Sequence, residues 1–254
     1  MPQLAEASYT EWPAAPVLCE RLACLWAAHM GEYGEPHVRR IIPDGCIDLI
    51  FSDGDLIIAG PDTESVELHA VPNRSFVGVR FRSGQASSVL GLPASELLDL
   101  RISAQEVLGD RVSPVLDRLA AAANPRAAAT ILEQAIVDWS RDRAPADALV
   151  ARAVTLIDAP RADWSIASLA NELGLSERQL RRRFQHAVGY GPKLLERVLV
   201  LRRFIHAASL PRSTSLAELA AEAGYADQPH LTRECRDLTA LTPTQLLGYP
   251  VTAA

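Results

Sequence analysis

Short apolar runs, several of them alternating with polar positions, predict a group of β-strands in the first third of the chain. Residues 66–71 and 76–82 alternate with period two, which puts their apolar side chains on one face of a strand. Residues 46–51 and 56–59 are apolar runs separated by Ser-Asp-Gly-Asp, a connection typical of a hairpin. These segments predict a small sheet or half-barrel between residues 39 and 82.

After Ser83 the apolar residues recur at the three- and four-residue intervals of helices. Helices are predicted over residues 85–90, 94–100, 114–123 and 126–143. Asn124 is expected to cap the last of them, with Pro125 in its first turn. Residues 17–29 also show helical spacing, although part of that stretch fits a strand.

Residues 143–145, Arg-Ala-Pro, mark the predicted domain boundary, because everything beyond them reads as helix. We therefore expect two domains, 1–143 and 144–254. The predicted fold class is α+β: a small β-rich, half-barrel-like N-terminal domain with a helical segment at 85–143, followed by an all-α domain.

An internal repeat organises the C-terminal domain. Residues 169–176 correspond to residues 219–226, and in each copy a leucine and an alanine share the apolar face of a first helix. Gly174 and Gly224 permit the positive φ that ends this helix, and Ser176 or Asp227 caps a second one. Each copy therefore predicts a helix-turn-helix unit.

The units are expected at 165–186 and 215–237, joined by a linker helix at 191–208. A linker of that length spans about 25 Å, the right order to hold two recognition helices one DNA turn apart. A single copy fits an ordinary helical hairpin equally well. Two copies, each followed by polar and basic side chains, favour DNA binding.

Charge and side-chain chemistry support this interpretation. The net charge is −6, but residues 148–254 carry +3 and residues 1–147 carry −9, as expected for domains with different partners. Arginine can bond guanine and glutamine can bond adenine through paired hydrogen bonds. The candidate DNA-binding residues are Ser176, Arg178, Gln179, Arg181 and Arg182 in the first unit and Gln228, His230, Thr232 and Arg233 in the second.

Three motifs carry a family resemblance. They are Gly-Tyr-Ala-Asp-Gln-Pro-His-Leu-Thr-Arg at 224–233, Thr-Pro-Thr-Gln-Leu-Leu at 242–247 and Gly-Tyr-Gly-Pro at 189–192. Over roughly residues 148–248 the chain thereby resembles the AraC/XylS family of bacterial transcription regulators. Cys235, Ala240 and the leucine pair 246–247 stand where that family usually has an aromatic residue, a glycine and a Tyr-Arg pair. The last departure puts a terminal phosphate contact in doubt.

The resemblance implies a sequence-specific regulator that binds a double-stranded DNA operator. It implies base-facing roles for Arg178, Arg181 and Arg182, and for Gln228, His230 and Arg233, although an arginine at the last position often ties the helix to the core. Residues 43–51 and 78–84 resemble the N-terminal domain of one AraC-type subgroup. That likeness implies a small sensing or dimerisation domain, so a small-molecule effector, a homodimer and RNA polymerase are expected partners.

Four residues are candidates for effector binding: Cys46, Arg80, Arg82 and Trp26. Arg80 and Arg82 share one face of a predicted strand, which is either a solvated outer face or an inner face able to bind an anionic effector. Trp12, Trp26, Phe51, Phe76 and Phe81 either line such a pocket or belong to the core. Cys46 lies beside a turn and is expected to be the most exposed cysteine, while Cys24 is expected to be buried.

Several other functions are disfavoured. Four scattered cysteines do not form a disulfide framework or a paired-ligand metal site, and no cofactor is expected. No apolar run is long enough to span a membrane and no secretory signal is evident, so a soluble cytoplasmic protein is expected. No catalytic motif stands out, so a non-enzymatic protein is predicted. The alternatives are a regulator whose N-terminal half only dimerises or senses redox state through Cys46, a fused DNA-repair methyltransferase, and an architectural DNA binder.

Overall fold

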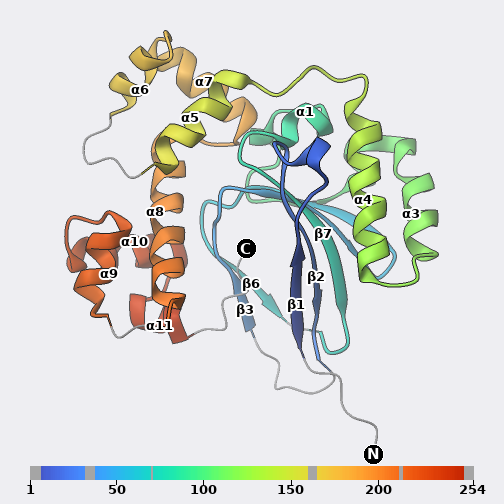
Figure 1. The fold of residues 1–254 in the computed structure, drawn as a ribbon, viewed down its shortest axis with the longest axis horizontal. Coiled ribbons are helices and arrows are strands. Elements are labelled where there is room, and N and C mark those ends of the chain that lie inside the picture. The colour runs from blue at the N-terminus through green and yellow to red at the C-terminus, as the bar shows by residue number, and fades with distance from the viewer. Residues whose placement is uncertain (1–6, 32–37, 70, 160–164, 212–213, 249–254) are drawn as a thin grey trace, which may run out of the picture.

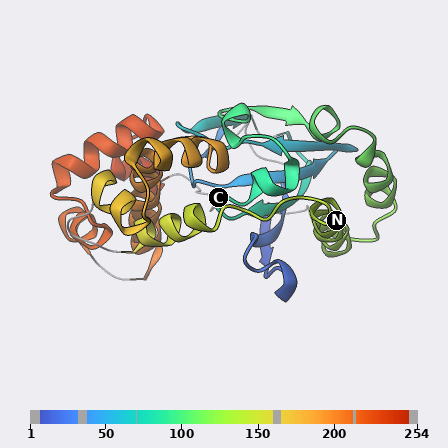
Figure 2. The ribbon, with the colours of Figure 1, turned by 90° about the horizontal axis from the view of Figure 1, so that it is seen from above.

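The computed structural model describes residues 7–31, 38–69, 71–159, 165–211 and 214–248. It confirms the predicted α+β class: a β-rich N-terminal domain lies beside an all-helical C-terminal domain (Figure 1). Seen from above, the two domains lie end to end, and the segment between the helices α4 and α5 runs from one to the other (Figure 2).

Six antiparallel strands form the main sheet in the order β1-β2-β7-β4-β5-β8. They are β1 (Ser8–Trp12), β2 (Leu22–His29), β4 (Ile47–Ser52), β5 (Asp55–Ala59), β7 (Ser75–Phe81) and β8 (Arg101–Ser103). The strands β3 (Val38–Ile41) and β6 (Val66–His69) pair antiparallel as a separate two-stranded ribbon. This β3–β6 ribbon lies on the side of the sheet that faces the C-terminal domain (Figure 1).

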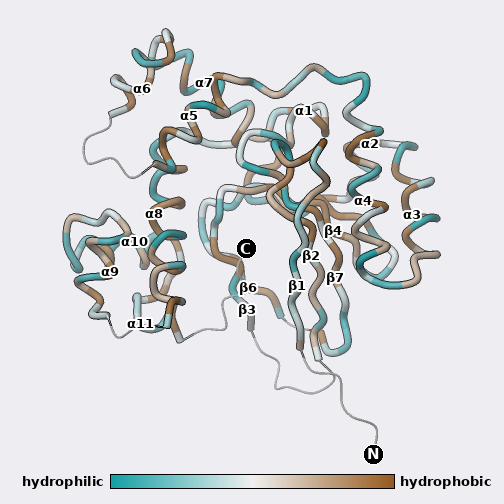
Figure 3. The backbone as a smooth tube through the Cα atoms, in the orientation of Figure 1, coloured by the Kyte–Doolittle hydropathy of each residue, from teal (hydrophilic) through white to brown (hydrophobic). Residues whose placement is uncertain are grey.

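The two faces of the sheet have different roles. Leu25, Leu49 and Val79 point to one face and pack in the core beneath the helix α4 (Pro125–Ser140). Their neighbours in the chain, such as Asp48 and Arg80, point to the other face, which is hollowed into a pocket. The core strands and the inner side of α4 are the more hydrophobic part of this domain in Figure 3.

The remaining helices of this domain are short. They are α1 (Ala86–Leu90), α2 (Ala104–Leu108) and α3 (Ser113–Ala120), with three-residue 3-10 turns at Pro16–Leu18, Ala94–Glu96 and Gly109–Arg111. As predicted, the Asn124 side chain caps α4 by accepting a hydrogen bond from the Ala127 amide, and Pro125 begins the helix.

The stretch 17–29, for which helical spacing and a partial strand are both expected, contains a 3-10 turn and then β2, so the strand alternative holds for its second part. Residues on both faces of β2 are buried, so period two is lost. One helix prediction for this half is wrong. The helix expected at 94–100 is a single 3-10 turn, because Asp99 adopts a positive φ of 57° and the chain then enters β8.

The C-terminal domain consists of α5 (Ala148–Asp158), α6 (Ile166–Glu172), α7 (Glu177–Ala187), α8 (Pro192–Ser209), α9 (Leu216–Ala223), α10 (Gln228–Thr239) and α11 (Pro243–Gly248). The pairs α6–α7 and α9–α10 are the two helix-turn-helix units, and α8 is the linker helix. Phe184 and Phe204 are fully buried in the separate cores of the first and second unit. Because α8 contributes side chains to both cores, it holds the two units together.

Candidate DNA interface and effector pocket

Helix α7 begins with a reciprocal cap. The Ser176 hydroxyl accepts a hydrogen bond from the Gln179 amide, and the Gln179 side chain accepts one from the Ser176 amide at 2.9 Å. Gly174 adopts a φ of 66° in the turn before this cap, as its position in the repeat predicts. Ser176 and Gln179 therefore fix where the helix starts, and the amide oxygen of Gln179 is engaged in the cap.

Arg178, Arg181 and Arg182 are all exposed on α7, at positions that share one face of a helix. Arg181 is paired with Glu177 at 3.1 Å. Arg178 and Arg182 have no ion-pair or hydrogen-bond partner within the described part of the chain. Two guanidinium groups on this face are thus available to a ligand.

The neighbouring Arg183 differs from these three. It is half-buried and bonds Asp147 at 2.6 Å, and Asp147 also caps α5 by accepting hydrogen bonds from the Leu149 and Val150 amides. Arg183 therefore ties α7 to α5.

Helix α10 has an equivalent start. Asp227 accepts a hydrogen bond from the His230 amide at 2.6 Å, and Gly224 ends α9 with a φ of 103°. Gln228 and Arg233 are exposed, and Arg233 has no partner among the described residues, so it does not tie this helix to the core.

The side chains of the other two candidates on α10, His230 and Thr232, make contacts within the protein. The His230 ring packs edge-on against Tyr225, with 5.3 Å between ring centroids. The Thr232 hydroxyl donates to the Gln228 carbonyl at 3.0 Å, one helical turn back.

Two arginines of α8 fix the second unit to the linker helix. Arg197 bonds Glu234 of α10 at 2.6 Å and lies 3.3 Å from Asp237. Arg203 donates to the Ala223 carbonyl at the end of α9, at 3.2 Å. The linker helix is therefore bonded to both helices of the second unit, to α10 through Arg197 and to the end of α9 through Arg203.

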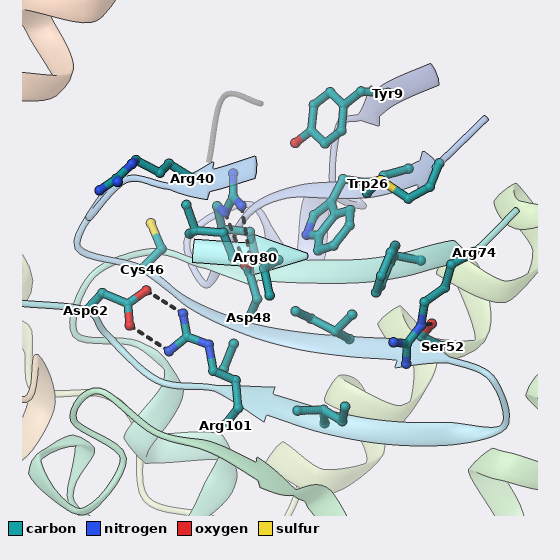
Figure 4. Close-up of a pocket in the computed structure, with 18 of the residues that line it drawn as sticks. Tyr9, Trp26, Arg40, Cys46, Asp48, Ser52, Asp62, Arg74, Arg80 and Arg101 are labelled. Atoms are coloured by element: carbon teal, nitrogen blue, oxygen red, sulfur yellow. Dashed lines mark hydrogen bonds and ion pairs between the residues drawn. The ribbon is translucent and has the colours of Figure 1, made fainter. Parts of the chain in front are cut away.

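A cavity of about 280 Å³ occupies the hollow face of the N-terminal sheet. Apolar side chains form most of its wall, including Trp26, Ile50, Ile57 and Phe76, and the β3–β6 ribbon closes one side with Ile41 and Leu68. Figure 4 shows the charged residues gathered toward one end and Arg74 with Ser52 at the other.

Two arginine–aspartate pairs stand in this pocket. Arg80 bonds Asp48 through two hydrogen bonds of 3.1 and 2.9 Å, and Asp44 lies 3.4 Å from the same guanidinium. Arg101 bonds Asp62 through two hydrogen bonds of 2.6 and 2.5 Å. Asp48 and Arg80 are directly opposite each other on β4 and β7, so the register of the sheet brings them together.

Burial controls the ionisation of these groups. Burial lowers the pKa of Arg80, but Asp48 and Asp44 raise it well above its usual value, so the guanidinium stays charged. Burial raises the pKa of Asp62, and the bond to Arg101 opposes that rise.

Three of the four predicted effector residues line the cavity, namely Trp26, Cys46 and Arg80. The prediction that Cys46 is the most exposed cysteine is wrong: it is 8% exposed, and burial with the nearby Asp44 raises the pKa of its thiol well above the usual value. Cys19 is the exposed cysteine, and Cys24 is buried as predicted.

Arg82 does not belong to the pocket. Strand β7 ends at Phe81, and the exposed Arg82 side chain donates to the Cys19 carbonyl at 2.8 Å. Of the five aromatic candidates, Trp26 and Phe76 line the cavity, whereas Trp12, Phe51 and Phe81 pack in or against the core on the opposite face.

Sequence reasoning missed Asp48, Asp62, Arg40, Arg74 and Arg101. Asp48 lies between Ile47 and Leu49 in an apolar strand, a position where a carboxylate needs a buried partner. Nothing local marks Arg101, because it reaches the pocket only through the pairing of β8 with β5.

Two features are absent from the described residues. No group of three or more potential metal ligands comes together there. Likewise, none of the helices in the described ranges combines the length and the apolar character needed to cross a membrane.

Comparison with known protein families matches two separate regions. Residues 169–248 match a helix-turn-helix domain, and residues 10–103 match a domain of unknown function, DUF6597. No curated protein shows significant similarity to the chain.

Among solved structures, a probable AraC family transcriptional regulator from Rhodopseudomonas palustris CGA009 is 23% identical, with a TM-score of 0.34, over 40% of this chain and 96% of the other. ToxT from Vibrio cholerae strain SCE256, bound to an unsaturated fatty acid, is 10% identical, with a TM-score of 0.46, over 100% of this chain and 99% of the other. ToxT from Vibrio cholerae O395 is 10% identical, with a TM-score of 0.44, over 96% of each chain. The paired units and the family match agree, so residues 169–248 form a helix-turn-helix domain.

Proposed function

We propose that α7 and α10 are recognition helices that read an operator from successive major grooves. Arg178 and Arg182 on α7, and Gln228 and Arg233 on α10, are the side chains we assign to bases, because all four are exposed. Ser176, Gln179 and Asp227 cap the two helices, so they serve mainly to fix the helix starts. Arg181, His230 and Thr232 complete the contact surface.

The experiment that tests DNA recognition is selection of operator sequences from random double-stranded DNA by the full chain, followed by footprinting. We expect an enriched site with two protected segments about 10.5 base pairs apart, on one face of the duplex. The footprint of Arg233→Ala should lose protection in one segment only. Protein that enriches no sequence, while binding all DNA equally, would instead be an architectural binder.

We further propose that a small molecule in the N-terminal pocket controls DNA binding. The observation that carries this proposal is that the β3–β6 ribbon touches both the pocket and the second recognition helix. Arg40 of the ribbon lines the pocket and donates a hydrogen bond to the Thr239 carbonyl of α10. Ser65, next to β6, donates to the Leu238 carbonyl at 2.8 Å and to the Thr239 carbonyl at 3.0 Å.

A second contact links the same pocket to the linker helix. Gly45 lies in the turn between Asp44 and Cys46, and a Cβ on it would come within 2.8 Å of the Leu195 side chain of α8. The Tyr190 hydroxyl lies 3.5 Å from the same point. A ligand that moved Asp44 or Cys46 would therefore press on the helix that positions both units.

Filling the pocket by mutation tests this control without a known effector. Ala28 lines the cavity on β2 and is 7% exposed, so Ala28→Phe should occupy part of the space. We expect operator affinity to change by the roughly 1–3 kcal/mol typical of coupling between sites. The exposed Ala121 supplies the control Ala121→Phe, which should have no effect. Unchanged operator affinity in a folded Ala28→Phe protein would argue against control through the pocket.

A further inference from the structure

We infer that the pocket takes an uncharged, mostly apolar ligand with a hydrogen-bonding oxygen, and not a carboxylate or an amine. This inference rests on the proposed function only in identifying the cavity as the effector site. It differs from the alternative in which Arg80 and Arg82 bind an anionic effector, because the four arginines that line the cavity are each paired with a protein carboxylate.

Each guanidinium in the pocket has an acid partner. Arg80 is held by Asp48 and Asp44, and Arg101 is held by Asp62. In Arg80 and in Arg101, two guanidinium nitrogens bond the two oxygens of one carboxylate, Asp48 or Asp62. A carboxylate ligand would have to displace one of these aspartates and leave a buried charge unpaired, which is strongly unfavourable.

The other two arginines are also occupied. Arg74 bonds Asp53 at 2.8 Å and the Ser52 hydroxyl at 3.1 Å, and its guanidinium lies over the Phe76 ring. Arg40 forms an ion pair with Glu67 and bonds the Thr239 carbonyl. Neither offers an uncompensated positive charge to an anion.

A cationic ligand would also lack a free partner of opposite charge in the pocket. Asp48 and Asp62 are buried or nearly so, and each already accepts two hydrogen bonds from its arginine. An ammonium group would add a positive charge beside Arg80 and Arg101 in a region that water does not screen well.

The wall of the cavity indicates what an uncharged ligand would touch. The Trp26 ring lies directly on Gly78, where a Cβ would come within 2.5 Å of it, and Tyr9 stacks on its other side with ring centroids 6.2 Å apart. The ring is thereby held at one orientation beside Phe76 and Ile50. This arrangement suits a flat apolar body.

The Trp26 indole also supplies a free donor. Its Nε1 is buried and has no hydrogen-bond partner among the described residues, and Figure 4 shows it on the side of the ring toward Arg80. A buried N–H without a partner is costly, so a ligand oxygen placed here would be favoured. The arginine–aspartate pairs nearby can both donate to and accept from an uncharged hydroxyl or carbonyl group.

Three probes that share one ring and differ in charge test the assignment: 2-naphthalenemethanol, 2-naphthoate and 2-naphthylmethylammonium. Binding to the full chain would be measured at pH 7 by calorimetry and by the shift in melting temperature. We expect the alcohol to bind at least about tenfold more tightly than either ion, because each ion would be buried without a partner. Equal or tighter binding of naphthoate or of the ammonium compound would overturn the inference, as would the absence of binding by all three.

The variant Trp26→Phe tests the role of the indole. It keeps a ring on Gly78 but removes the N–H, so affinity for the alcohol should fall by about three- to tenfold. Affinity for 2-methylnaphthalene, which has no oxygen, should not fall by that factor. Equal losses for both probes would show that Trp26 acts only through its shape.

These measurements use no DNA, so they are independent of the proposed control of transcription. If the alcohol binds and operator affinity does not respond, the ligand class stands and the proposed effector control fails. If Ala28→Phe alters operator affinity but only naphthoate binds, the control stands and the ligand class fails.

Discussion

The Arg40 guanidinium donates a hydrogen bond to the main-chain carbonyl of Thr239, 2.9 Å away, although the two residues are 199 positions apart in the chain. Thr239 is the last residue of α10, so this carbonyl lies at the negative end of the helix dipole. A guanidinium at that point stabilises the helix end and fixes the β3–β6 ribbon against it. The contact joins the pocket wall to α10.

Removing this contact should loosen the end of α10. In Arg40→Met we expect the chain to lose about 1–3 kcal/mol of stability, since a charged hydrogen bond is lost from a side chain that is mostly buried. Amide exchange at the last turn of α10 should accelerate. Arg82→Met is the matched control, because the exposed Arg82 side chain bonds the Cys19 carbonyl and is not among the residues that line the pocket. If exchange in α10 were the same in both variants, the ribbon would not restrain the helix.

Two adjacent arginines of α7 should respond differently to substitution. Arg182→Ala should cost about 1–3 kcal/mol of binding to the selected operator and much less on random DNA, as expected for a base contact. Arg183 bonds Asp147 instead, so Arg183→Ala should lower stability slightly and weaken binding to all sequences by one common factor. Competition between operator and random DNA measures the difference. Equal losses on both DNAs for Arg182→Ala would make Arg182 a phosphate contact.

Substituting Arg80 should destabilise the protein more than substituting Asp48, its partner in the buried ion pair. Arg80→Met leaves Asp44 and Asp48 without their cation and should cost about 3–5 kcal/mol. Asp48→Asn leaves Arg80 with Asp44, so it should cost only about 1–2 kcal/mol. Denaturant titration of both variants checks this order.

The pH dependence of Arg80→Met has a definite sign. Burial raises the pKa of Asp48, and loss of Arg80 removes the charge that opposes that rise. A carboxyl whose pKa is higher in the folded than in the unfolded state destabilises the fold above its folded pKa and ceases to do so as the pH falls below it. The deficit of Arg80→Met relative to wild type should therefore shrink as the pH falls from neutral toward the ordinary pKa of an aspartate. A constant deficit would mean that Asp48 gains water in the variant.

The elements that sequence alone predicts are those with local chemistry. Asn124, Ser176 and Asp227 each accept the backbone hydrogen bond expected of a cap, and Gly174 and Gly224 have the positive φ that their turns need. These features depend on three or four neighbouring residues, so a pattern in the chain contains them. The two helix-turn-helix units followed from such patterns.

The pocket depends on partners far apart in the chain, and here prediction failed in part. Arg80 and Arg82 alternate in sequence, but β7 ends between them, so one is buried with Asp48 and the other is exposed. The sequence predicts Trp26 as a pocket residue, but the position of its ring on Gly78 arises from the register of β2 with β7. Arg40 meets Thr239 only after both domains have formed.

The four cysteines should differ sharply in reactivity, which bears on the alternative that Cys46 senses redox state. Burial raises the pKa of Cys24 and of Cys235 to about 12, and that of Cys46 well above its usual value, so almost none of these thiols is ionised at pH 8. Because the thiolate is the reactive form, we expect a disulfide reagent to modify the exposed Cys19 first. Cys19→Ser should then remove the fast phase in the native protein, while all remaining cysteines react once the chain is unfolded. A fast phase that survived in Cys19→Ser and was abolished by Cys46→Ser would show that Cys46 is reached in the native state, and it would restore the redox alternative.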